Sequence, residues 1–208
     1  MAPALLLAAA MAGASPAGYP AAEVIGALRE ACPSATAVTT VLKGATPAGW
    51  TRAADPAATP VGKLAAMGKE MGGAMLSGTG HIIGDIAVLE RTVAGERLYL
   101  IPSGIVNGDT MVVGCRLYDP GETRRIPAAE ATRILGRKPT SSSDQPMLSK
   151  LGWDIGAPDD ADSFEIVSVP ADSPVVALLT LSGLMMKADW VMPGATDPAP
   201  AKGSEEKK

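Results

Sequence analysis

Residues 86–101 read IAVLERTVAGERLYLI, and this stretch gives the clearest indication of the fold. Residues 86–93 and 97–101 are rich in β-branched, aromatic and leucine side chains, which favour strands. The dipeptide Ala94-Gly95 between them suits the tight turn that joins two antiparallel strands. The stretch therefore predicts a β-hairpin.

Further strands are expected on both sides of this hairpin. Ile82-Ile83 precedes it, and Asn107-Gly108 offers a second tight turn into the apolar run 110–118. Near the C-terminus, residues 164–169 and 175–181 have the composition of a last strand pair. Together these segments predict an antiparallel sheet of about five strands, built as a meander plus a C-terminal strand pair.

Helical patterns surround the predicted strands. Apolar residues recur at helical spacing over residues 21–32. Ser34 is a candidate N-cap for a short helix over 34–42 that Gly44 would end, and Pro127 opens a third pattern over 127–137. Residues 63–76 are a weaker candidate because three glycines disfavour a helix. We expect an α+β fold with two to four helices on one face of the sheet, and a polar loop over 139–146.

The N-terminal residues resemble an export signal. An apolar run over residues 4–12 is followed by an Ala12-x-Ala14 cleavage pattern. The n-region carries no Lys or Arg, so an alanine-rich N-terminal helix remains the alternative. We expect a signal peptide over 1–14, one α+β domain over 15–192 and a disordered tail over 193–208. The mature protein would then be periplasmic or secreted.

The two cysteines support the same compartment. An exported protein with two cysteines usually joins them in a disulfide. Cys32 falls at the end of the first predicted helix and Cys115 inside a predicted strand. The sequence therefore predicts a bridge that ties the N-terminal helix to the sheet.

Composition argues against several classes of function. The 18 basic and 22 acidic residues leave a net charge of -4 and no extended basic cluster, so no nucleic-acid partner is expected. The apolar run 175–186 is too short to span a bilayer. The glycines of Gly78-Thr79-Gly80 precede a predicted strand, whereas a dinucleotide-binding loop opens a helix, so no cofactor is expected.

A hydrolase is one functional alternative. His81 is the single histidine, so any catalysis that depends on histidine must use it. Ser77 and Ser103 lie in glycine-containing segments and are the candidate nucleophiles, with Asp85 nearby as a possible orienting group. Neither serine lies in the Gly-x-Ser-x-Gly or Ser-x-x-Lys pattern that would support this hypothesis.

Copper binding is the second alternative. Met67, Met71 and Met75 recur every four residues, which would align three thioethers on one helix face, with His81 as a possible fourth ligand. Soft thioethers select Cu(I). Methionines at this spacing also fill hydrophobic cores, which is the simpler interpretation.

Other chemistry-bearing residues favour structural roles. Asp160 and Asp162 do not follow the ligand spacing of a calcium-binding loop. Trp50, Trp153 and Trp190 are isolated and are expected to anchor the core or its rim. The leading hypothesis is an exported, non-enzymatic protein, stabilised by one disulfide, that binds a protein or small-molecule partner.

Overall fold

The computed structural model describes residues 18–75, 80–83, 87–154 and 160–193. The predicted signal peptide, Ser77, Asp85 and almost all of the predicted tail lie outside these residues. The part of the chain described contains no helix with the length and apolar character needed to cross a membrane.

The fold is α+β and is built on one antiparallel sheet, as predicted, but the sheet is larger than expected. It contains nine described strands, whose order is β1-β3-β4-β5-β9-β8-β7-β6, with β2 also paired to β4. Their bounds are β1 Thr51–Arg52, β2 His81–Ile82, β3 Leu89–Val93, β4 Glu96–Asn107, β5 Thr110–Pro120, β6 Ser141–Gln145, β7 Leu148–Trp153, β8 Ser163–Val169 and β9 Gly183–Pro193.

Two meanders meet at the centre of the sheet. The first runs through β3, β4 and β5, and the second runs from the edge strand β6 through β7 and β8 to β9. Both predicted turns of the first meander are present, at Ala94-Gly95 and around Gly108, and all three residues have positive φ angles. The meanders join where β9 pairs with β5 over the full length of both strands.

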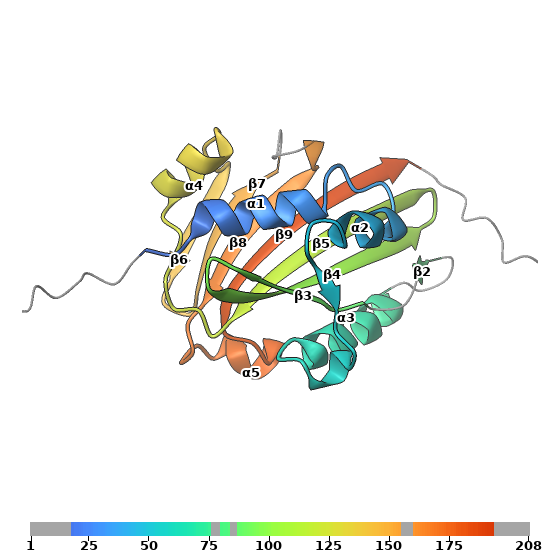
Figure 1. The fold of residues 1–208 in the computed structure, drawn as a ribbon, viewed down its shortest axis with the longest axis horizontal. Coiled ribbons are helices and arrows are strands. Elements are labelled where there is room, and N and C mark those ends of the chain that lie inside the picture. The colour runs from blue at the N-terminus through green and yellow to red at the C-terminus, as the bar shows by residue number, and fades with distance from the viewer. Residues whose placement is uncertain (1–17, 76–79, 84–86, 155–159, 194–208) are drawn as a thin grey trace, which may run out of the picture.

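Helices cover both faces of the sheet, whereas the sequence predicted one covered face. The α-helices are α1 Ala21–Ala31, α2 Val38–Ala45, α3 Gly62–Met75, α4 Ala128–Leu135 and α5 Val175–Leu179, and η1 Pro56–Ala58 is a 3₁₀ turn. In Figure 1, α1 and α2 cross the sheet in front of β4, β5 and β9. The helix α3 packs on the opposite face through a separate apolar cluster that includes Val61, Tyr99 and Tyr118.

The main core lies between the sheet and helices α1, α2 and α4. The apolar face of α1 includes Val24, Ile25 and Leu28, which are essentially inaccessible to solvent. Trp50, Trp153 and Trp190 are also buried, which confirms the core role predicted for them. Gly104 allows close packing at α2, because a Cβ there would lie 2.9 Å from a methyl carbon of Val38.

Three local predictions are wrong. The second helix begins at Val38 rather than near Ser34, which has a φ of 41°, and Gly44 lies inside it rather than ending it. The predicted polar loop 139–146 contains β6, which pairs with β7. Residues 175–179 form the short helix α5 instead of a strand, and the last strand is β9.

Candidate functional site

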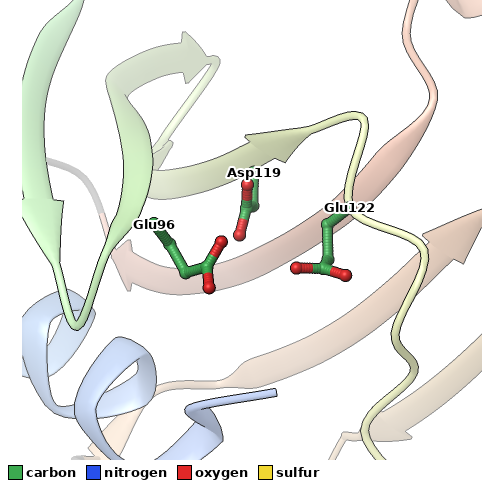
Figure 2. Close-up of side chains that lie close together, drawn as sticks. All are labelled: Glu96, Asp119 and Glu122. Carbon is green, nitrogen blue, oxygen red and sulfur yellow. The ribbon is translucent and has the colours of Figure 1, made fainter. Parts of the chain in front are cut away.

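Three carboxylates converge where β4 begins and β5 ends. Figure 2 shows Glu96 from β4, Asp119 from β5 and Glu122 from the following turn. One carboxylate oxygen of each lies within 4.8 Å of one oxygen of each of the other two. Asp119 is 5% exposed, and the side chains of Glu122 and Glu96 are 5% and 21% exposed. We call these three residues the carboxylate cluster.

Tyr19 and Arg124 connect the carboxylate cluster to the rest of the fold. The Tyr19 hydroxyl donates a hydrogen bond of 3.0 Å to Asp119 Oδ2. The Arg124 guanidinium donates to Glu96 Oε1 at 2.6 Å and, through Nε, to Glu122 Oε1 at 2.9 Å. It also lies over the Tyr19 ring, 5.4 Å from the ring centroid. The segment before α1 is therefore held against the start of β4 and the end of β5.

The surroundings raise the pKa of one carboxyl group of the carboxylate cluster and lower that of another. Burial raises the pKa of Asp119 to about 6, and the nearby charges of Glu96 and Glu122 add to this rise, while Tyr19 and Arg124 oppose it. Hydrogen bonds from Arg124 hold the pKa of Glu122 below its usual value. Burial and the neighbouring Asp119 raise the pKa of the Tyr19 phenol.

Oxygen ligands in this arrangement are of the type that Ca²⁺ or Mg²⁺ prefers. The guanidinium of Arg124 already bonds to two of the three carboxylates and supplies a positive charge that a metal ion would otherwise provide. The arrangement therefore fits an internal charge network better than a metal site.

Sequence reasoning missed the carboxylate cluster because its members are distant along the chain and form no motif. One signal was available. The turn at Gly108 pairs Asn107 with Thr110, and extending that register toward the start of β4 brings residue 96 opposite residue 121. Counting outward from the turn would have placed Glu96 beside Asp119 and Glu122.

A second group of charged side chains lies on the sheet face opposite α1 and α2. It consists of Arg116 on β5, Lys187 and Asp189 on β9, Glu165 on β8 and Lys150 on β7. We call these five residues the charged face. The apolar cluster around α3 covers the neighbouring row, which includes Tyr99, Tyr118 and Met185.

Asp189 forms ion pairs with two cations of the charged face. Lys187 Nζ is 2.7 Å from its Oδ2 atom, and Arg116 Nη2 is 3.7 Å from its Oδ1 atom. The Oδ1 atom is buried and has no hydrogen-bond partner among the described residues. On the adjacent strands, Lys150 Nζ donates to Glu165 Oε1 at 2.6 Å.

Ser103, one of the two predicted nucleophiles, borders the charged face. Its hydroxyl accepts a hydrogen bond from Arg116 Nη1. His81 lies in β2, where its backbone pairs with Val106, three residues after Ser103 on β4. Ser77 and Asp85 are outside the described residues, so the hydrolase hypothesis stays a prediction.

The three methionines of the copper hypothesis all lie in α3, so the helix predicted near residues 63–76 is present. Met67 is half-buried. The side chains of Met71, Met75 and His81 are outside the described part of the structure, and the copper site also stays a prediction.

The predicted disulfide joins Cys32 to Cys115. It links the C-terminal end of α1 to the middle of β5, with 6.6 Å between the two Cα atoms. Both cysteines are almost completely buried, at 2% and 0% exposure.

Asp162 accepts a hydrogen bond from the Val191 backbone N–H, so it holds the start of β8 against β9.

The described residues also surround a shallow depression of about 550 Å³ at the end of α1, between Gly49 and the ion pair of Glu30 with Arg91.

Comparison with known proteins identifies no relative: no family model matches the chain, and neither does any curated protein or solved structure.

Proposed function

We propose that this chain is an exported, non-enzymatic binding protein that is stabilised by the Cys32–Cys115 disulfide and binds its ligand at the charged face. The observation that carries the proposal is the buried disulfide between α1 and β5. Structural disulfides persist mainly in oxidising compartments such as the periplasm or the extracellular space. The apolar N-terminal run and its Ala12-x-Ala14 pattern favour the same location.

The charged face supports a binding role. A sheet face that is only partly covered by helices exposes whatever side chains its strands carry, and here the central rows carry both signs of charge. Charged residues in the middle of a wide sheet add little to folding, because desolvation offsets most of their mutual attraction. A surface that retains them is better explained by a ligand.

Ser103 favours binding over hydrolysis. Its hydroxyl oxygen accepts from the cationic Arg116, whereas a serine nucleophile needs an adjacent base that accepts its proton. In the binding protein, Ser103 positions the Arg116 guanidinium.

Cell fractionation and intact-mass measurement of the protein expressed from its full-length gene test the proposal. We expect a periplasmic or secreted species that begins near Ser15 and lacks the two thiol hydrogens of Cys32 and Cys115. Native mass spectrometry of the same sample would show any co-purified ligand, and substitution of Lys187 by Gln should remove it.

Two results would contradict the proposal. One is an uncleaved cytoplasmic protein with two free thiols. The other is a co-purified ligand whose retention is unchanged by K187Q but is lost on substitution of the exposed Arg97, which lies on β4 outside the charged face.

A further inference from the structure

Two positive side chains face each other at the centre of the charged face. Arg116 on β5 and Lys187 on β9 are directly opposite in the antiparallel ladder. Like charges in this position destabilise a strand pair. Asp189 lies next to both and offsets part of the repulsion. The five side chains of the charged face comprise three cations and two carboxylates, so one positive charge is left over.

The two cations also retain unused hydrogen-bond donors. Within the described residues, Arg116 donates one hydrogen bond, to Ser103, and its distance of 3.7 Å to Asp189 is too long for another. A guanidinium has five N–H donors and an ammonium has three. The side chains of Arg116 and Lys187 are 28% and 27% exposed, while that of Asp189 is 11% exposed. A ligand approaching this face therefore meets the cations first.

Gly114 leaves room for the Arg116 guanidinium. A Cβ atom at this residue would lie 2.5 Å from Arg116 Nη1 and 2.6 Å from Asp189 Oδ1. Both groups therefore occupy space that any other residue would fill. Glycine in the interior of a strand often marks a close approach of this kind. The Ser103 hydroxyl oxygen, 3.1 Å from the same Cβ position, accepts from Arg116 Nη1 and holds the guanidinium in place before a ligand arrives, which reduces the entropy cost of binding.

We propose that Arg116 and Lys187 bind an oxyanion, the carboxylate or phosphate group of a small-molecule ligand. The planar guanidinium suits two parallel hydrogen bonds to such a group, and the lysine adds a point charge from the neighbouring strand. Asp189 repels the same anion and limits its affinity. This inference rests on the proposed binding function and specifies the chemistry of the ligand.

The test is a titration of the isotope-labelled full chain with inorganic phosphate, and separately with malonate, at constant ionic strength, followed by amide chemical shifts. We expect saturable shifts at residues 114–116 and 187–189. R116Q and K187Q should each weaken binding by about tenfold or more, the equivalent of one lost charge-assisted hydrogen bond. D189N should tighten it, since the competing carboxylate is removed. Comparing the two anions shows whether phosphate or carboxylate is preferred.

Arg125 provides the matched control, because it is an exposed arginine whose ion pair with Asp144 lies away from the charged face. R125Q should bind as the unmodified chain does. Shifts that rise linearly without saturation would overturn the inference, as would equal weakening by R125Q and K187Q. If R116Q does not fold, K187Q and D189N still decide the outcome. Export and the disulfide are measured separately, so a failure here leaves the compartment assignment standing.

Discussion

Single residues show how burial and charge act against each other in this protein. Asp119 is nearly inaccessible, yet it carries a carboxylate that accepts a hydrogen bond from Tyr19 and lies beside two more carboxylates. Its pKa is raised to about 6, from 3.8 in an unstructured chain. The folded state therefore holds the Asp119 proton more tightly than the unfolded state does.

This difference predicts a pH-dependent stability. The contribution of Asp119 is fully present below about pH 4 and is lost as the pH rises through about 6, with a total on the order of 2–3 kcal/mol. We expect D119N to lose this component of the pH dependence, because the amide oxygen still accepts from Tyr19 but does not ionise. Urea unfolding at several pH values between about 5 and 7 measures the upper part of this loss, about 1 kcal/mol.

The pH range separates the contribution of Asp119 to stability from that of Glu122. The pKa of Glu122 is lowered, so its contribution is lost only as the pH falls below 4.5, its pKa in the unfolded chain. D144N is the control, since Asp144 is an exposed residue paired with Arg125. A D119N profile parallel to that of the unmodified chain would show that Asp119 is not the titrating group.

Gly114 yields a second prediction at this scale. In G114A the added methyl group displaces the Arg116 guanidinium and Asp189. Because the far end of arginine can move, we expect a modest loss in the free energy of unfolding, about 1 kcal/mol, at the low end of the range for overpacking. G26A in α1 is the comparison, because a Cβ there meets no atom within 4 Å and alanine favours helices. Denaturant unfolding should show G114A less stable than G26A.

Among the helices and strands, the local sequence pattern predicted the β3–β4 hairpin and the first helix but not the edge of the sheet. The segment Ser141–Gln145 has the composition of a loop, and every residue in it is exposed. It becomes a strand because β7 provides a hydrogen-bonding partner along its whole length. Short, polar edge strands of this kind protect a sheet from pairing with other chains.

Near the C-terminus, a segment predicted as a strand forms a helix instead. Residues 175–181 are apolar and resemble a buried strand, but α5 forms there and Thr180 ends it in the left-handed conformation. The last strand begins at Gly183, whose φ is 117° and where a Cβ would lie 2.2 Å from the Asp119 carbonyl oxygen. The close approach to the end of β5 thus determines where β9 begins. The periodicity of the sequence does not show this contact.

At the scale of the whole molecule, the disulfide joins the helical layer to the central strand of the sheet. It closes a loop whose ends are 83 residues apart. Replacing both cysteines by alanine removes this constraint from the unfolded chain. We expect the free energy of unfolding to fall by about 2–5 kcal/mol, which urea unfolding would measure under non-reducing conditions.

The reduced unmodified chain is the control for this variant, because it has the same broken link with the original side chains. Its stability should match that of the double variant within about 1 kcal/mol, apart from the small cavity that alanine leaves. If the double variant and the oxidised chain unfold at the same urea concentration, the bridge does not stabilise the fold.

Local sequence was sufficient to predict the α+β class, the β3–β4 hairpin, the turn into β5, the first helix and the pairing of the two cysteines. Each follows from short-range rules, namely alternation, turn chemistry, helical spacing and a cysteine count with one possible partner. The width of the sheet in the described part of the chain and the charged face follow only from the tertiary structure. Those features arise when β5 and β9, far apart in the chain, pair along their full length and align Arg116 with Lys187. Segments with similar local sequence become strands or helices according to the partners they pack against. A short stretch of sequence does not show which partners those are.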